Sequence, residues 1–262
     1  MTRLDDRRLA EYRNIREPEL LRRRGLFMAE GRMVVDRLLD LAGHGYRVQS
    51  LLLNDASFAA LGHRLSQLPD VQVFVCSTEE LASIAGFNLH RGCLALAECP
   101  PERDAASVIK DAELLLVLEA LGDADNVGSA FRSAAAFGAT GVLLSPTCCD
   151  PLYRKAIRTS MGSVLRMPYA RLGNWPRDLA ALKAEGFTLV ALTPRDYAID
   201  LANCPRRQPR QKLALLVGTE GPGLTADAEA FADVCVRIPM QPDVDSLNLA
   251  TATGIALYAL TV

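Results

Sequence analysis

The sequence contains neither a long hydrophobic run nor a signal-peptide pattern at its start. No apolar stretch in the 262 residues approaches the roughly 18 residues that a transmembrane helix needs. The first residues, from Met1 to Arg8, are mostly charged, whereas a secretory signal carries an apolar stretch in this region. These features predict a soluble, intracellular protein, and we expect a cytoplasmic location without membrane attachment.

The sequence also lacks a Cys-x-x-Cys pair, although it contains seven cysteines. An odd number of cysteines cannot all pair within the chain, and their spacing does not support a zinc site. Cys93 and Cys235 lie in apolar stretches, where a free thiol packs as a small hydrophobic side chain. We therefore expect reduced cysteines and no bound metal.

The sequence has no excess of positive charge, since it contains 29 basic and 31 acidic residues. The distribution of charge matters more than this balance. Residues 151–177 contain six basic side chains and no acid, and residues 206–212 and 22–24 form two further basic runs. One such run is typical of a solvated surface. Several runs together could neutralise the phosphates of a nucleic acid, and they favour RNA only in combination with the motifs described below.

Residues 1–105 alternate between short apolar stretches and amphipathic segments. We expect strands at 26–29, 48–53, 71–76 and 93–97, with helices between them. One helix begins at the capping box Ser77-Thr78-Glu79-Glu80 and ends near Gly86. The pattern predicts a compact α/β/α sandwich. The polar stretch Pro100–Asp104 is interpreted as a linker to a second domain.

Strands and helices alternate regularly from residue 107 to residue 262. The expected strands are 114–118, 142–145, 164–169, 187–192, 213–217 and 234–239, and the expected helices are 126–137, 153–161, 177–185, 225–232 and 246–260. This order predicts a doubly wound, mostly parallel α/β sheet. Asp245 or Ser246 is the expected N-cap of the last helix.

Three stretches place glycines and polar residues after apolar strands of this second region, where ligands bind in open α/β sheets. They are Asn126-x-Gly128-x-x-x-Arg132, then Gly218-Thr219-Glu220-Gly221-x-Gly223, then Ile238-Pro239-Met240 followed by Ser246-Leu247-Asn248. In this order the three motifs resemble those of the SpoU (TrmH) branch of the SPOUT RNA methyltransferases. The match in order is specific, whereas the glycine motif alone would be weak.

This resemblance implies an S-adenosylmethionine-dependent transfer of a methyl group to a ribose 2′-hydroxyl of structured RNA. It also implies that the C-terminal helix is threaded through a loop as a SPOUT trefoil knot. Glycines let a ligand approach the backbone, and apolar side chains form walls for a purine. The expected cofactor-binding residues are Leu216, Gly218, Thr219, Ile238, Met240, Ser246 and Leu247, and the expected catalytic residues are Arg132, Asn126, Glu220, Ser246 and Asn248.

Arg132 matches the family's essential arginine. A guanidinium is always protonated in proteins, so we expect Arg132 to position a phosphate or to stabilise the alkoxide rather than act as a base. Asn126 is expected to orient Arg132, the ribose or Glu220, with a helix cap as the alternative. Glu220 and Asn248 are expected to be catalytic or structural.

Residues 1–105 resemble, more loosely, the substrate-binding domain of SpoU enzymes, which has the fold of the ribosomal L30e/L7Ae proteins. The resembling stretches are the Glu30-Gly31 turn with its helix and Asn88-Leu89-His90-Arg91-Gly92. We therefore expect an RNA-binding L30e-like domain at 1–105 and a methyltransferase domain at 107–262. The additional domain favours ribosomal RNA over transfer RNA.

The alternatives are a tRNA 2′-O-methyltransferase and an inactive RNA-binding protein of the same fold. A nucleotide-dependent oxidoreductase would need Gly-x-Gly-x-x-Gly after its first strand, and residues 126–129 do not supply it. The resemblance further implies a homodimer through the C-terminal domain, with Arg132 in a composite site. Apolar residues on a second side of the last helix agree with such an interface: Ile255, Leu257, Tyr258 and Ala259.

Overall fold

The computed structural model describes residues 6–13, 17–86, 92–241, 243–244 and 246–262. The chain forms two compact units. Unit 1 contains Met1–Pro101 and Leu152–Leu165, and unit 2 contains Glu102–Pro151 and Arg166–Val262. The sequence did not predict that residues 152–165 would group with the N-terminal residues. No helix in the described ranges is long and apolar enough to cross a membrane.

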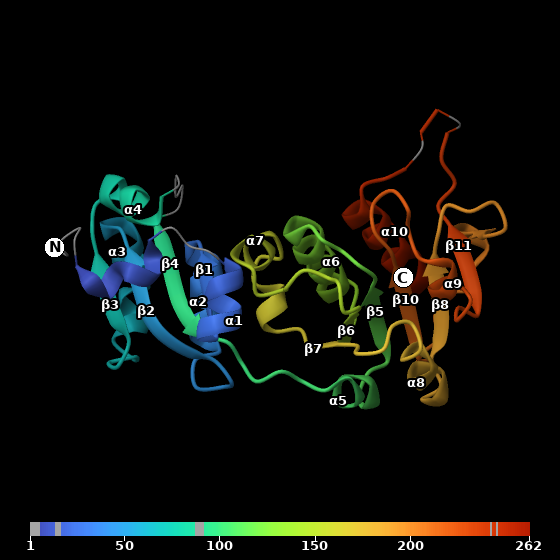
Figure 1. Cartoon of the computed structure of the whole chain (residues 1–262), viewed down its shortest axis with the longest axis horizontal. Coiled ribbons are helices and arrows are strands. Elements are labelled where there is room, and N and C mark those ends of the chain that lie inside the picture. Colours follow the sequence, from blue (N-terminus) through green and yellow to red (C-terminus); the bar gives the residue numbers. More distant parts are fainter. Residues whose placement is uncertain (1–5, 14–16, 87–91, 242, 245) are drawn as a thin grey trace. The chain divides into compact units, whose positions relative to one another are not determined.

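Unit 1 is built on a four-stranded sheet in the order β1-β4-β2-β3 (Figure 1). The strands are β1 (Leu26–Glu30), β2 (Arg47–Leu53), β3 (Gln72–Val75) and β4 (Cys93–Glu98), and the helices are α1 (Glu17–Arg24), α2 (Arg32–Asp40), α3 (Asp55–Leu65), α4 (Thr78–Ala85) and α7 (Arg154–Thr159). β4 runs antiparallel to β1 and β2, while β3 runs parallel to β2. Short 3₁₀ turns cover Arg7–Tyr12 and Ser163–Leu165.

Helices cover both faces of this sheet. Side chains of the Arg7–Tyr12 turn, α1 and α4 pack with Met28, Leu52 and Leu94 in one buried cluster. α2 and α3 contact each other and the strands β1, β2 and β4. The predicted capping box is confirmed, because Ser77 and Glu80 bond reciprocally at the start of α4, and Gly86 ends this helix with a φ of 77°. The predicted α/β/α sandwich therefore agrees with unit 1.

Unit 2 contains a seven-stranded sheet within the described residues, in the order β7-β6-β5-β10-β8-β11-β9. The strands are β5 (Leu114–Leu118), β6 (Gly141–Leu144), β7 (Tyr169–Arg171), β8 (Thr188–Leu192), β9 (Ile199–Asp200), β10 (Leu213–Val217) and β11 (Val234–Arg237), and the helices are α5 (Ala105–Lys110), α6 (Ala124–Ala136), α8 (Leu179–Ala184), α9 (Ala226–Glu229) and α10 (Leu249–Thr261). Every neighbouring pair is parallel. The predicted doubly wound α/β fold is confirmed.

Helices pack on both faces of this parallel sheet. Val108 of α5, Leu182 of α8 and Ala228 of α9 share one buried cluster with Leu115 and other strand residues. α6 and α10 pack against each other on the opposite face (Figure 1). Their contact is close, because a Cβ added at Gly254 would lie 3.6 Å from the Ser133 hydroxyl. The threading of α10 through a loop stays a prediction of the family resemblance.

Several expectations for unit 2 were wrong in detail. The strand expected at 164–169 forms only at Tyr169–Arg171, because Val164 and Leu165 are buried in a 3₁₀ turn of unit 1 instead. The N-cap of α10 is Asn248, whose side chain accepts from the backbone N–H groups of residues 250 and 251. Ser246 is thus not the cap, and Asp245 lies outside the described residues. The last strand ends at Arg237, before Pro239.

Candidate active site

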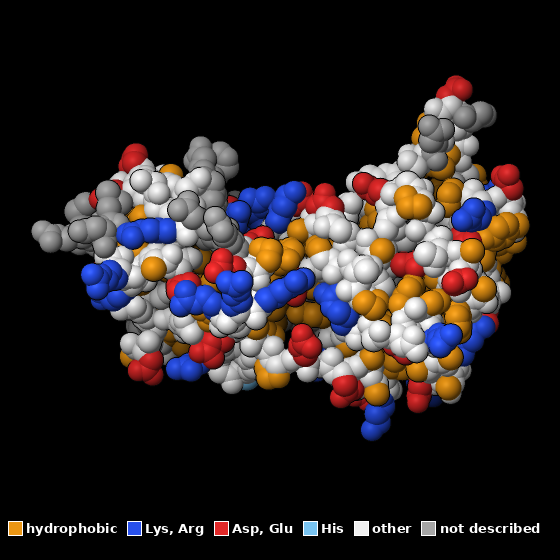
Figure 2. Space-filling model, viewed as in Figure 1, with side chains coloured by type: hydrophobic (Ala, Val, Ile, Leu, Met, Phe, Trp, Pro, Cys, Tyr) orange, Lys and Arg blue, Asp and Glu red, His pale blue; other side chains and the backbone are white. Residues whose placement is uncertain are grey.

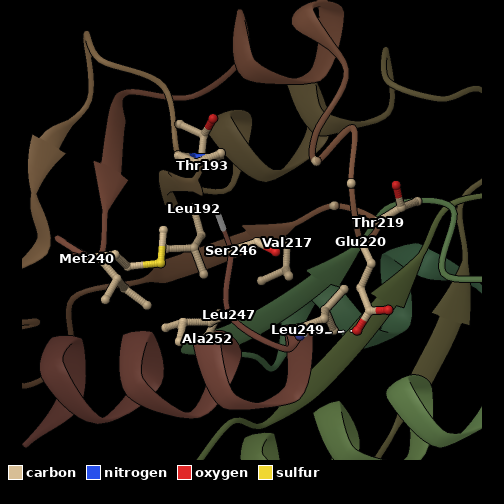
Figure 3. Close-up of a pocket in the computed structure, with 15 residues that line it drawn as sticks. Leu192, Thr193, Val217, Thr219, Glu220, Met240, Ser246, Leu247, Leu249 and Ala252 are labelled. Atoms are coloured by element: carbon tan, nitrogen blue, oxygen red, sulfur yellow. Dashed lines mark hydrogen bonds between the residues drawn. The ribbon is translucent and has the colours of Figure 1, made fainter. Parts of the chain in front are cut away.

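A pocket lies at the carboxyl ends of β8, β10 and β11 and at the start of α10 (Figure 3). It encloses about 680 Å³ of space, part of which is open to solvent. The pocket is lined by Leu192, Thr193, Pro194, Val217, Gly218, Thr219, Glu220, Gly221, Gly223, Ile238, Met240, Ser246, Leu247, Leu249 and Ala252.

The loop after β10 forms one side of the pocket and folds back tightly on itself. Thr219 and Gly223 exchange backbone hydrogen bonds of 3.2 and 3.1 Å. A Cβ at Gly218 would lie 2.2 Å from the carbonyl carbon of Gly223 and from the nitrogen of Leu224, so only glycine fits there. Gly221 and Gly223 have φ values of 88° and 73°, which glycine adopts without strain. The glycines of the motif are therefore required by the turn itself.

The pocket walls combine apolar side chains with a few polar groups. Leu192, Met240 and Leu247 provide apolar surface (Figure 3). The Thr219 hydroxyl is buried and finds no hydrogen-bond partner in the described part of the chain. A buried polar atom of this kind is normally paired, so the orphaned hydroxyl indicates a missing polar partner. An adenosine-containing molecule, with a flat apolar base and several polar groups, fits these walls.

Glu220 and Asn248 meet beside the pocket. Asn248 donates from its side-chain amide to Glu220 Oε1 at 3.2 Å. The backbone N–H of Leu249 lies 3.5 Å from the same oxygen (Figure 3). The carboxylate therefore lies at the N-terminus of α10, where backbone N–H groups favour negative charge. Both side chains are exposed rather than buried in a cleft. The structure thus joins two of the predicted catalytic positions, and it places Ser246 in the pocket lining next to them.

Four predicted site residues do not line the pocket of their own chain, and one of them, Asn248, lies beside it. Leu216 is fully buried in the core of unit 2. Asn126 lies in the first turn of α6, whose N-cap is Asp123, so it is not the cap. Arg132 lies six residues further on, roughly 9 Å along the helix axis. Arg132 is exposed, and it makes no hydrogen bond or ion pair with any other described residue.

The pocket also contains residues that the motifs did not reveal. Leu192, Thr193 and Pro194 follow β8 directly and close one side of the pocket. Leu249 and Ala252 extend it along the first turn of α10. The strand at 187–192 was predicted, and ligands bind at the carboxyl ends of parallel strands. That rule was therefore the signal for Thr193 and its neighbours, although no sequence motif marks them.

Most of the basic runs are engaged within the chain. Arg154 and Arg158 pair with Glu30, and Arg171 donates to the carbonyl oxygens of residues 145, 146 and 148. Similar contacts hold side chains of the other two runs: Arg206, Arg207, Lys212, Arg23 and Arg24. On the face shown in Figure 2, basic and acidic side chains are interspersed. The basic runs are therefore not three sets of free cations.

The cysteines agree with the sequence prediction. All seven are free, and Cys76, Cys93 and Cys148 are buried. Burial raises the pKa of the Cys93 and Cys149 thiols to about 12. These thiols are therefore protonated near neutral pH and serve as packing groups. Within the described part of the chain, no group of His, Cys, Asp and Glu side chains is arranged to hold a metal ion.

Comparison with known proteins decides the family. Residues 113–258 match the model of the SpoU rRNA Methylase family. The chain belongs to the SpoU family. A protein of Mycobacterium bovis, named an uncharacterized tRNA/rRNA methyltransferase, is 41% identical over 261 residues, which cover 98% of this chain and 89% of that protein. A 23S rRNA (guanosine-2′-O-)-methyltransferase RlmB from Xanthomonas campestris is 30% identical over 192 residues, covering 70% and 74%.

Solved structures of methyltransferases share the fold over nearly the whole length of this chain. The AdoMet-bound rRNA methyltransferase from Sinorhizobium meliloti has a TM-score of 0.83 at 26% identity, over 99% of this chain and 96% of that one. The SpoU methyltransferase AviRb from Streptomyces viridochromogenes has a TM-score of 0.79 at 22% identity, over 98% of each chain, and shows the fold alone. As a SpoU member with a SPOUT fold, this chain is an RNA methyltransferase whose cofactor is S-adenosylmethionine.

Proposed function

We propose that this SpoU protein methylates a ribose 2′-hydroxyl of structured RNA, with ribosomal RNA as its substrate. The observation that carries the proposal is the pocket, which gathers the second and third sequence motifs at the carboxyl ends of β10 and β11, the two strands that flank β8. The RlmB relative, a guanosine-2′-O-methyltransferase of 23S rRNA, supports both the ribose and the ribosomal substrate. The mycobacterial relative's name includes both RNA classes, so transfer RNA is the second candidate.

Two roles are needed for this reaction, and different residues of the chain provide them: some bind the cofactor, and one stabilises the charge that develops on the ribose oxygen. Gly218, Ile238 and Leu247 would hold the adenosine part of the cofactor by backbone approach and apolar contact. S-adenosylmethionine supplies an electrophilic methyl group when bound. A ribose hydroxyl is a poor nucleophile, so the reaction gains from a fixed positive charge near the developing alkoxide. Arg132 is the residue that we assign to this role.

We also propose that the protein is a homodimer through unit 2. Arg132 does not line the pocket of its own chain, so we propose that it serves the pocket of a second subunit. Ile255, Tyr258 and Val262 form an exposed apolar stripe at i, i+3 and i+7 along α10 and its C-cap, with 40%, 54% and 57% of their surface accessible. Phe137, the C-cap of α6, packs edge-on against Tyr258. A second copy would cover this stripe.

The expected surplus of apolar residues on α10 is smaller than the sequence indicated. Leu257 is fully buried within its own chain, and Ala259 is half-buried. Ala252 lines the pocket, and Thr253 occupies the buried face in its place. The dimer proposal therefore depends on Ile255, Tyr258 and Val262 rather than on a second full face.

Unit 1 is proposed to grip the RNA. Its α/β/α fold agrees with an L30e-like domain, and Gly31 makes the turn from β1 to α2 with a φ of 95°. A shortened chain without this unit should lose selection of its RNA. This role depends on the family resemblance, and the stretch from Asn88 to Arg91 that would take part in it lies outside the described residues.

Labelling of RNA by the purified protein tests the proposal. The protein is incubated with methyl-labelled S-adenosylmethionine and either unmodified ribosomal RNA or transfer RNA, and the RNA is digested to nucleosides. A labelled 2′-O-methylnucleoside from ribosomal RNA is the expected product. A base-methylated nucleoside would refute ribose chemistry, while label in transfer RNA alone would select the second candidate. Calorimetric binding of the cofactor without any labelling would indicate an inactive RNA-binding protein.

A further inference from the structure

A buried carboxylate lies next to the pocket without contacting it. Glu119 follows β5 directly and exposes only 3% of its surface. Its Oε1 accepts from the indole N–H of Trp175 at 2.5 Å and from the hydroxyl of Thr225 at 2.8 Å, and its Oε2 accepts from the Thr225 backbone N–H at 2.8 Å. These partners are neutral. Burial of a carboxylate costs free energy, and hydrogen bonds such as these offset only part of that cost. An ionised Glu at this buried position therefore destabilises the fold relative to an apolar residue.

The partners of Glu119 connect it to the glycine loop of the pocket. Thr225 follows Gly218–Leu224 and caps α9, because its hydroxyl accepts from the Ala228 N–H at 3.3 Å. The loop therefore begins at the end of β10 and ends at a residue that Glu119 holds twice. The backbones of Gly218 and Leu224 approach each other so closely that a Cβ at Gly218 would lie 2.2 Å from the Leu224 nitrogen, and we expect the two ends of the loop to move together. A displacement of Thr225 would thus move the pocket-lining backbone.

The backbone at Glu119 is fixed as well. Its N–H donates to the carbonyl oxygen of Val217, a pocket residue, at 2.9 Å. The next residue, Ala120, has a φ of 56°, a conformation that residues other than glycine rarely adopt. The Ala120 N–H donates to the Ser145 hydroxyl at 2.8 Å, which holds this turn. Glu119 therefore projects from a rigid turn at the end of the strand next to β10.

We propose that Glu119 is a positioning residue for cofactor binding, which fixes the loop Gly218–Leu224 in its binding geometry through Thr225 and does not itself touch the cofactor. The proposal builds on S-adenosylmethionine binding in the pocket and does not depend on which RNA is methylated. It assigns a role to a residue outside the three sequence motifs. The single tryptophan of the chain, Trp175, shares the carboxylate and so reports on it optically.

Replacement of Glu119 by glutamine makes the two oxygen positions of the carboxylate chemically different. Each oxygen accepts an N–H group, one from Trp175 and one from Thr225. A glutamine has one acceptor oxygen and one NH₂ group, so either orientation points N–H at N–H on one side. Glu119→Gln must therefore release Trp175 or Thr225, although its size and shape are unchanged.

Calorimetric titration of the whole chain with S-adenosylmethionine measures the consequence. We expect the dissociation constant of Glu119→Gln to rise roughly tenfold, as for the loss of one buried hydrogen bond to a charged group. The matched control is Ile109→Val on α5, a truncation in the buried cluster that also contains Leu224, which loses packing but no hydrogen bond to Glu119 or Thr225. Ile109→Val should bind the cofactor with wild-type affinity, although its thermal stability should fall by an amount comparable to that of Glu119→Gln.

A double-mutant cycle tests whether the effect passes through Thr225. Thr225→Ala removes the hydroxyl but keeps the backbone N–H, so we expect a rise of about threefold in the dissociation constant. In the Glu119→Gln background the same change should cost less, because the two residues act as one unit. If Glu119→Gln does not fold, Thr225→Ala against Ile109→Val decides the question. Equal affinities of those two variants would overturn the proposal.

The response of Trp175 fluorescence to the cofactor provides a readout that a purely structural role of Glu119 would not affect. Cofactor titration should change the emission of the wild type, and Glu119→Gln should shift the emission of the free protein and remove most of the cofactor response. A folded Glu119→Gln protein with wild-type affinity and an unchanged response would overturn this inference alone. A wild-type protein that does not bind S-adenosylmethionine would instead overturn the proposed function, and this inference with it.

Discussion

The helices α6 and α7 follow neighbouring strands of one sheet, yet their arginines have opposite surroundings. Arg132 of α6 is exposed and unpaired among the described residues. Arg154 and Arg158 of α7 contact Glu30, and Glu17 accepts from the Arg154 backbone N–H at 2.5 Å. Both helices were expected to offer positive charge to RNA. The difference teaches that basic runs in a sequence do not predict free charge.

The pairing on α7 is part of the fold of unit 1. Glu30 is only 7% exposed at the end of β1, so its carboxylate needs the arginines of α7. Arg37 of α2 also donates to the carbonyl oxygen of Met161, which follows α7. A charge that is neutralised within the chain contributes to folding. A charge without an internal partner, such as Arg132, is available to a ligand or a second subunit.

Among the changes that test the difference between the arginines of α6 and α7, Arg132→Ala should have the largest effect on activity. We expect methyl transfer to fall about 100- to 1000-fold, because a charge at the developing alkoxide is lost. The affinity for S-adenosylmethionine should stay within about threefold, since Arg132 does not line the pocket. Methylation assays and calorimetry measure the two quantities. Loss of cofactor binding in this variant would mean that Arg132 is structural, as the α7 arginines are.

Glu30→Gln should act on stability instead of on catalysis. Removal of the carboxylate leaves Arg154 and Arg158 without this partner, and we expect the free energy of unfolding to fall by about 2 kcal/mol. Urea denaturation measures this value. The control is Glu19→Gln, which breaks the exposed 3.6 Å pair with Arg23 and should change stability by less than about 0.5 kcal/mol. Equal effects of both variants would show that the α7 pairs are ordinary surface pairs.

Tyr258→Glu tests whether Arg132 serves a second subunit. A charge in the exposed stripe of α10 should weaken the dimer roughly tenfold or more, because an aromatic contact is lost and a charge is buried. Sedimentation equilibrium should give twice the 28.4 kDa chain mass for the wild type and a lower mass for the variant. Phe58→Glu, an exposed aromatic residue on α3 of unit 1, is the control and should leave the mass unchanged. A fully active wild-type monomer would rule out the composite site.

Local patterns in the sequence predicted the elements around the pocket well. The strands at 114–118 and 213–217 have the predicted bounds, because continuous apolar runs are bounded there by polar or glycine residues. Most of the motif positions expected to bind the cofactor, including Gly218 and Ile238, line one pocket. Local composition decides both results, since each motif follows its strand directly.

Contacts between distant residues were not predictable in this way. The acids that neutralise Arg154 are 124 and 137 residues away in the sequence. The same long-range packing places Val164 and Leu165 in unit 1, although their apolar run resembles a strand. A division at residue 105 would therefore separate α7 from Glu17 and Glu30. Thr193 was missed because its role depends on the position of β8 beside β10, which no local pattern encodes.

A change at Glu17 tests whether burial or ion pairing decides the charge of an acid next to α7. Of the four variants in this section, Glu17→Gln should have the smallest effect. Burial raises the pKa of Glu17 above its ordinary value of 4.5, although the Arg154 N–H and guanidinium and Arg158 act to lower it. Glu30 nearby raises the pKa further. Because the folded state then holds the proton more tightly than the unfolded state, the stability that Glu17 contributes is fully present below pH 4.5 and is lost as the pH rises through the folded pKa.

The measurement is the unfolding free energy of the wild type minus that of Glu17→Gln, followed from about pH 4 to about pH 7. We expect this difference to decline as the pH rises, by well under the effect of Glu30→Gln, since Glu17 keeps 24% of its side chain exposed. The opposite slope would mean that the attraction to Arg154 exceeds the cost of burial. Glu17 would then be an ion-pair partner equivalent to Glu30, and the hydrogen bond to the start of α7 would be stabilised by charge over the whole range.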